Sequence, residues 1–186
     1  MSKSLMPQSD FTEATVATES VYDGAMLKVR DDQVRLPDGK LAKREWIEHP
    51  GAVIILAQLD DGQVVLERQF RYPVRRHMIE LPAGKIEPGE DPLLTAQREL
   101  LEETGYVARH WKHFMAVHPC IGYSNERIEF YQASGLTLQR RQLDDGEFLD
   151  VFTLSLAEAL TMVDSGEITD TKTMLGLFWL DRQSRR

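Results

Sequence analysis

The stretch from Gly84 to Tyr106 limits the possible folds most, because it encodes a loop, a helix and a helix stop in close succession. Asp91 is a favourable N-cap and Pro92 a favourable first helical residue, so the sequence predicts a helix that begins there. Gly105 lies where a helix C-terminus needs a left-handed residue. The helical period also predicts one apolar face, formed by Leu93, Leu94, Gln97, Leu100 and Leu101.

The opposite face of this helix is predicted to be acidic, with Glu99, Glu102 and Glu103 on it. Glu99 and Glu103 lie one turn apart, and like charges at that spacing destabilise a helix by roughly 0.2–0.5 kcal/mol per pair. A compensating cation is therefore expected. Mg²⁺ fits, because it takes carboxylate oxygens and keeps positions for water and for substrate phosphates. A solvated acidic surface is the alternative explanation for three glutamates alone.

The stretch as a whole resembles the Nudix box, a pattern of residues at fixed spacing. The matching residues are Gly84, Glu90, Arg98, Glu99, Leu100, Glu102, Glu103, Gly105 and Tyr106, the last of which is aromatic where an aliphatic residue is commoner. The Nudix family hydrolyses nucleoside diphosphates linked to another moiety, using Mg²⁺ or Mn²⁺. The resemblance therefore implies a metal-dependent hydrolase in which Arg98 pairs with Glu90 and holds the loop against the helix.

The resemblance also implies the metal ligands. Glu99, Glu103 and the backbone carbonyl of Ala83 would hold two to three Mg²⁺ or Mn²⁺ ions, and Glu102 would assist. Such ions lower the pKa of a bound water and offset charge on a diphosphate.

Two further segments resemble the ADP-ribose pyrophosphatase group of this family. Glu67–Tyr72 resembles the segment whose arginine contacts the diphosphate in that group, which implies that Arg71 binds substrate. Lys43–Trp46 resembles part of that group's N-terminal sheet, which implies that Arg44 reaches the substrate and that Trp46 stacks on the adenine. A role in the core is an equal alternative for Trp46.

The loop His118–Glu126 is predicted from its proline and glycine, and it ends in a carboxylate. In the ADP-ribose group a loop glutamate helps to activate or orient the attacking water. The resemblance therefore implies Glu126 as the proton acceptor, although two residues separate the proline from the glycine here. Glu102 is an alternative, and Glu147 is a lesser candidate for the same role.

Strands interleaved with helices indicate an α/β fold, an α/β/α sandwich with a mixed sheet in the form that the resemblance implies. Residues 1–49 are expected to form a small N-terminal antiparallel β-sheet for substrate binding and dimerisation, and residues 50–186 the catalytic domain. Ala52–Ala57 reads as a strand covered on both faces, and Tyr72–His77 as a basic loop. Two C-terminal helices are expected, capped by Ser155 and Asp170.

Composition excludes several classes of function. The net charge of −8, from 22 basic and 30 acidic residues, argues against nucleic acid as a partner. No apolar run is long enough for a membrane span, and the N-terminus lacks the apolar core of a signal peptide. The single cysteine, Cys120, rules out a disulfide within the chain and suits the cytoplasm.

The predicted reaction is hydrolysis of ADP-ribose to AMP and ribose 5-phosphate. Cleavage of another nucleoside diphosphate sugar, such as GDP-mannose, is the alternative within the enzyme class. A non-catalytic nucleotide-sensing module is the alternative outside it, although such modules often lose a glutamate of the box and none is missing here. Three N-terminal strands bury too little to be stable alone, and in the relatives that sheet is exchanged between subunits, so a homodimer is expected.

Overall fold

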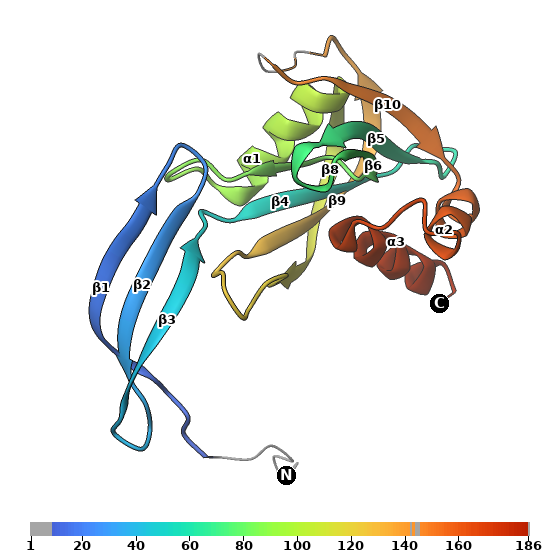
Figure 1. The fold of residues 1–186 in the computed structure, drawn as a ribbon. Coiled ribbons are helices and arrows are strands. Elements are labelled where there is room, and N and C mark those ends of the chain that lie inside the picture. The colour runs from blue at the N-terminus through green and yellow to red at the C-terminus, as the bar shows by residue number, and fades with distance from the viewer. Residues whose placement is uncertain (1–8, 142, 144–145, 186) are drawn as a thin grey trace. The chain divides into compact units, whose positions relative to one another are not determined.

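The structure, a computed structural model, describes residues 9–141, 143 and 146–185 (Figure 1). The chain divides into two compact units. The first comprises the residues up to His49 together with Cys120–Asn125, and the second comprises Pro50–Pro119 and Glu126–Arg186. Within the part of the chain that the structure describes, no helix has both the length and the apolar character needed to cross a membrane.

The first unit contains a three-stranded antiparallel sheet in the order β1-β2-β3. Its strands are β1 (Ala14–Asp23), β2 (Lys28–Arg35) and β3 (Leu41–Glu48). Gly39, with a φ of 87°, lies in the turn between β2 and β3, where a left-handed residue is needed. Every residue of β1 is exposed, and among the described residues of this unit Val34 is the one buried apolar side chain.

The second unit holds two sheets. One is a mixed sheet in the order β7-β4-β9-β8, in which β4 and β9 are parallel, and the other is an antiparallel sheet in the order β10-β5-β6. The strands are β4 (Ala52–Ala57), β5 (Val64–Arg71), β6 (Arg76–Glu80), β7 (Ala83–Lys85), β8 (Tyr106–Val117), β9 (Ile128–Leu138) and β10 (Leu149–Leu154). The helices are α1 (Pro92–Glu99), its π-helical continuation η2 (Leu100–Thr104), α2 (Leu156–Asp164), α3 (Thr171–Ser184) and the short 3-10 turn η1 (Tyr72–Val74).

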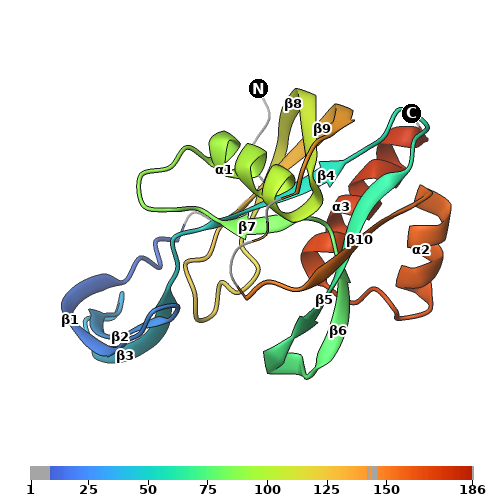
Figure 2. The same cartoon turned by 90° about the horizontal axis from the view of Figure 1, so that it is seen from above.

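Strand β4 lies at the centre of this unit, and its alternating side chains pack into two cores. Ile54 and Leu56 pack toward α2 and α3, in a cluster that includes Phe130 and Leu177. Val53, Ile55 and Ala57 pack toward α1, in a cluster that includes Ala96 and Leu100. The second view shows α1 on one side of the strands and α3 on the other (Figure 2). The predicted α/β/α layering and the strand covered on both faces are therefore confirmed.

The helix starts were also predicted correctly. Ser155 forms a complete capping box with Glu158 at the start of α2, and the side chain of Asp170 accepts a hydrogen bond from the backbone N–H of Thr173 at the start of α3. The prediction of a basic loop over Tyr72–His77 was wrong in its second half. Only Tyr72–Val74 form a turn, and Arg76 and His77 belong to β6, where they pair with β5.

Candidate active site

The site is built on α1 and the loop before it. The carboxylate of Asp91 accepts hydrogen bonds from the N–H groups of Leu93 and Leu94 at 2.9 and 3.4 Å, and Pro92 is the first helical residue. After Glu99 the helix widens into the π turn η2, and Gly105 ends it with a φ of 77°. π turns inside helices are rare and are frequent at functional sites. The predicted start and stop of this helix are thus confirmed.

The predicted apolar face of this helix is wrong in part, because Leu100 packs on the sheet as expected but Leu94 and Gln97 are exposed. The side chains that pack on the sheet are those of Ala96 and Leu100, and Glu103 is buried beside them. Leu94, by contrast, is 57% exposed. The physical reason is that the carboxylates reach strand β7, so the acidic face is turned toward the sheet and part of the leucine face is turned away from it.

Two close contacts join the acidic face to β7. The Glu103 carboxylate accepts a hydrogen bond from the Ala83 N–H at 3.0 Å. At Gly84, an added Cβ would lie 1.9 Å from Glu99 Cδ, so Glu99 occupies space that every other residue type would fill. The glycine at the start of the motif is therefore required by the side chain that follows it on the helix.

Arg98 ties together three carboxylates of the motif. Its guanidinium donates two hydrogen bonds to Glu90, at 3.0 and 3.1 Å, and one each to Glu99 and Glu102 at 2.9 Å. These hydrogen bonds lower the pKa of Glu90 to about 2. Arg98 therefore links the loop to the helix, through the contact with Glu90 that the sequence indicated.

Glu99 and Glu103 have the electrostatics of a cation site. Burial raises the pKa of Glu99, and the charges of Glu102 and Glu147 add to the increase, against the lowering effect of Arg98. Burial also raises the pKa of Glu103 well above its usual range, and the charges of Glu67, Glu99 and Glu147 contribute. Both carboxylates thus lie in a field that favours a bound proton or a bound cation.

The donor set fits a hard divalent cation, because it consists of the carboxylate oxygens of half-buried Glu99 and buried Glu103 and the adjacent backbone at Ala83. Within the described residues, no three carboxylate, imidazole or thiol side chains form a ready-made metal cage. A Mg²⁺ site needs only one or two carboxylates and leaves its other positions to water and phosphate. Glu99 and Glu103 would hold the ion.

Two buried glutamates next to this site were not singled out from the sequence. Glu67 and Glu80 face each other across β5 and β6, and they are 0% and 2% exposed. Burial alone would raise the pKa of Glu80, but hydrogen bonds from Arg71 and Lys172 lower it. Glu67 accepts a hydrogen bond from Gln69 on one oxygen, and its other oxygen has no partner within the described part of the chain.

Glu67, when ionised, therefore places in the core a charge that Gln69, Arg71 and Lys172 offset only in part. Burial, followed by the charge of Glu80, raises its pKa to about 8. The sequence of β5 did not signal this, because Glu67 is followed by the polar residues Arg68 and Gln69; in the structure residues 64–67 are all fully buried. A strand that is buried on both faces leaves a glutamate no route to solvent.

The structure places the remaining predicted residues as follows. Arg71 donates two hydrogen bonds to Glu80 at 2.7 and 2.9 Å, through Nε and Nη2. Glu126 is half-buried in the loop before β9. Glu147, in the segment before β10, raises the pKa of both Glu99 and Glu103, whereas Glu126 is not among the main causes of either shift.

Arg44 and Trp46 lie in the first unit, on β3. Arg44 forms an ion pair with Glu13, with Nε donating at 2.8 Å. The indole N–H of Trp46 donates to Asp32 at 2.9 Å, and the indole is partly buried. Both side chains are therefore already held by carboxylates of their own unit.

Comparison with known proteins agrees with this geometry. Residues 48–174 match the NUDIX domain model, and residues 13–47 match the model of the nucleoside diphosphate sugar hydrolase N-terminal domain. The chain is 40% identical to the ADP-ribose pyrophosphatase of Bacillus subtilis (strain 168), over 90% of this chain and 92% of that protein. It is 39% identical to the methanol dehydrogenase activator of Bacillus methanolicus, over 93% of this chain and 95% of that protein.

A solved structure described as an ADP compounds hydrolase superimposes with a TM-score of 0.83, covers 97% of this chain and 100% of its own, and is 21% identical, which supports the fold. The Nudix match covers more than half of the chain, and the carboxylates of the motif lie together on one helix against β7. The chain belongs to the Nudix family and is a Nudix hydrolase, a class that generally uses divalent metal ions.

Proposed function

We propose that this protein hydrolyses ADP-ribose to AMP and ribose 5-phosphate with two to three Mg²⁺ or Mn²⁺ ions. The observation that carries the proposal is the pair of half-buried Glu99 and buried Glu103, whose carboxylates both have raised pKa values and lie against Ala83 and Gly84. The choice of ADP-ribose is supported by the name of the relative from Bacillus subtilis. Cys120, the single cysteine, supports a cytoplasmic location.

A divalent cation at Glu99 and Glu103 would supply Lewis acidity, which polarises a phosphoryl oxygen and makes a bound water more acidic. The protein supplies the rest of the chemistry. Arg98 keeps Glu90, Glu99 and Glu102 in one fixed arrangement through charge-assisted hydrogen bonds. Glu102 assists by sharing that guanidinium, so its role is to orient Arg98.

The proton of the attacking water needs an acceptor, and we assign it to Glu147. The assignment is supported by the effect of its charge on both Glu99 and Glu103, which requires proximity to both. Glu126, the residue favoured from the sequence, is not a main cause of either shift and is the second choice. A proton acceptor must come within hydrogen-bond reach of the water, directly or through one other water.

Arg71 is proposed to bind the diphosphate. Its Nε and Nη2 are occupied by Glu80, which fixes the plane of the guanidinium and leaves Nη1 to meet an anionic oxygen. Arg44 and Trp46 are proposed to bind the adenosine half. For that role Arg44 would exchange its partner Glu13 for the substrate, whereas the contact of Trp46 with Asp32 leaves the ring face for stacking.

A homodimer with exchanged N-terminal strands is proposed because the first unit leaves much apolar surface uncovered. Its exposed apolar side chains include Phe11, Val16, Val21, Tyr22, Met26, Ile121 and Tyr123. The three strands of this unit bury too little to hold their shape without a partner surface. Sedimentation of the purified protein would report the subunit number directly.

A panel of substrates tests the proposed activity. ADP-ribose, ADP-glucose, GDP-mannose and NAD would each be incubated with Mg²⁺ or Mn²⁺, and the products identified by mass. The proposal expects ADP-ribose to be cleaved most efficiently, with AMP and ribose 5-phosphate as products. Preference for GDP-mannose would move the assignment to the alternative nucleotide sugar, and binding without cleavage would favour a sensing module.

A further inference from the structure

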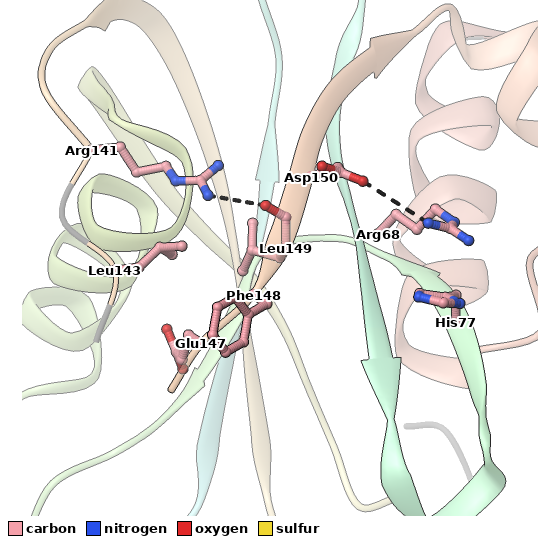
Figure 3. Close-up of a pocket in the computed structure, with 8 residues that line it drawn as sticks. All are labelled: Arg68, His77, Arg141, Leu143, Glu147, Phe148, Leu149 and Asp150. Carbon is pink, nitrogen blue, oxygen red and sulfur yellow. Dashed lines mark hydrogen bonds and ion pairs between the residues drawn. The ribbon is translucent and has the colours of Figure 1, made fainter. Parts of the chain in front are cut away.

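A hollow of about 330 Å³ opens beside the proposed proton acceptor (Figure 3). Its size is at the lower end of the range of small-molecule sites, which is about 300–1,000 Å³. The polar and aromatic residues that line it are Arg68, His77, Arg141, Glu147, Phe148 and Asp150. They come from β5, β6 and β10 and from the segment that leads into β10.

Glu147 connects the hollow to the carboxylate site. It lines the hollow, and its charge raises the pKa of both Glu99 and Glu103. Geometry supports the same connection: Arg141, which also lines the hollow, has its backbone N 3.2 Å from the position of an added Cβ on Gly105, two residues beyond Glu103. A nucleoside diphosphate sugar has its diphosphate in the middle, so a diphosphate held at the carboxylates extends in two directions, and the hollow offers space for one of the two ends.

The polar groups of the hollow are arranged in opposing pairs. In Figure 3 the Arg141 side chain points to the carbonyl of Leu149, to which it donates at 3.0 Å, and Arg68 points to Asp150 at 3.9 Å. Two guanidinium groups thus share the hollow with two carboxylates, those of Glu147 and Asp150. Near-balanced charge with many donors and acceptors suits a neutral ligand with several hydroxyl groups better than an anion.

Phe148 adds an apolar platform to these polar groups. It is 85% exposed, although a phenylalanine gains free energy when it is covered. The face of an aromatic ring is electron-rich. It therefore attracts the weakly positive C–H face of a sugar ring, while the hydroxyl groups at the sugar's edge meet Arg and carboxylate side chains.

We infer that this hollow binds the neutral sugar of the substrate, the half that leaves as the sugar phosphate. Phe148 covers the C–H face of the sugar, and Arg68, Arg141 and Asp150 contact its hydroxyl groups. The inference rests on the proposed function, because it presumes that a nucleoside diphosphate sugar is bound at Glu99 and Glu103. It makes Phe148 a residue that selects for the sugar and not for the nucleoside.

Phe148→Ala tests this inference through binding. The imidazole signals of His77, which lines the hollow, would be followed by NMR during titration with ribose 5-phosphate and, separately, with inorganic phosphate. The inference expects ribose 5-phosphate alone to shift these signals in the unsubstituted protein. Phe148→Ala should weaken that binding about tenfold, as expected for loss of a good aromatic contact, and Phe148→Tyr should restore it.

Kinetics provides the second test. Phe148→Ala should raise KM for ADP-ribose about tenfold. It should leave KM unchanged for the β-methyl ester of ADP, which has a methyl group in place of the second sugar. Phe178→Ala is the matched control, because Phe178 is 46% exposed on α3 and does not line the hollow; it should change neither value.

An equal change of KM for both substrates would overturn the inference, as would a shift of the His77 signals by inorganic phosphate as large as that by ribose 5-phosphate. If the unsubstituted protein cleaved no nucleotide sugar, the proposed function would fail instead. The titration with ribose 5-phosphate would then still decide whether the hollow binds a sugar.

Discussion

Replacement of Glu67 by glutamine should change the stability of the metal-free protein in opposite directions at low and high pH. Glu67 is fully buried, and its pKa is raised from 4.5 to about 8. A group whose pKa is raised on folding contributes stability that is fully present below the unfolded pKa and is lost as pH rises through the folded one. For Glu67 that window extends from about pH 4.5 to about pH 8.

The size of the stability change follows from the folded and unfolded pKa values of Glu67. A difference of about 3.5 pH units, at about 1.36 kcal/mol per unit, corresponds to about 5 kcal/mol, most of which is lost by pH 8. The introduced glutamine cannot ionise, so it avoids this loss, but its buried amide costs about 1–3 kcal/mol if it lacks partners. Glu67→Gln is therefore expected to destabilise the protein at pH 5 by about 1–3 kcal/mol and to stabilise it at pH 8 by about 2–4 kcal/mol.

Urea denaturation in the presence of EDTA, at pH 5, 6, 7 and 8, measures both free energies of unfolding. Glu80→Gln is a matched control, because Glu80 lies directly opposite Glu67 on β6 and has a lowered pKa. The ionised Glu80 carboxylate stabilises the folded protein above the pKa that Glu80 has in the unfolded chain, so Glu80→Gln should lower the free energy of unfolding at pH 7 and 8. The reasoning would be refuted if the unsubstituted protein were equally stable at pH 5 and 8, or if Glu67→Gln were destabilising at pH 8.

Three further predictions concern the site. Gly84→Ala should lower turnover at least about tenfold and weaken Mn²⁺ binding measured by electron paramagnetic resonance, because the added Cβ would displace Glu99. Gly122→Ala is the control and should change neither, because the space around Gly122 is open; a fully active Gly84→Ala protein would exclude the close contact between residue 84 and Glu99. Glu147→Gln should reduce kcat by about 10²–10⁴ and Glu126→Gln much less, and the reverse order would return the proton acceptor to Glu126. Addition of Mg²⁺ should raise the melting temperature more at pH 8 than at pH 6, because burial has raised the pKa of the carboxylates that would hold the ion, which must lose their protons to bind it. An equal rise at pH 6 and pH 8 would show that Glu99 and Glu103 do not hold the metal.

The helix and its neighbours show how much of the fold the sequence specifies. Asp91, Pro92 and Gly105 fix the start and stop of the helix formed by α1 and η2, because caps and left-handed residues act within one turn of the chain. The apolar run Ala52–Ala57 identifies the central strand for a similarly local reason. The Nudix pattern identifies the carboxylate helix because its spacing is fixed.

The orientation of that helix could not be predicted, because it depends on a contact distant in sequence. A local pattern assigns leucines to the core and glutamates to solvent. Here the backbone of Ala83 and the missing side chain of Gly84 draw Glu103 and Glu99 inward instead. The burial of Glu67 was missed for a related reason: its environment depends on β6 and on Glu80, which β5 alone does not reveal.

The role proposed for Glu147 shows the same limit. In the sequence it is one acidic residue among Asp144, Asp145 and Asp150, and its distance along the chain from Glu99 gives no sign of proximity. Its effect on the pKa values of Glu99 and Glu103 appears only after folding. Residues of a site that come from separate loops are therefore the part that a single sequence predicts least well.

The most direct test of the proposed metal site is to measure both the cation affinity and the activity of Glu103→Gln. The introduced glutamine keeps the shape of the side chain and can still accept the hydrogen bond from Ala83, but it lacks the charge that a divalent ion needs. We predict that the variant unfolds at a temperature close to that of the unsubstituted protein, binds Mn²⁺ more weakly and releases AMP from ADP-ribose at least about a hundredfold more slowly. Unchanged Mn²⁺ affinity together with full release of AMP would contradict the assignment of this helix as the metal site.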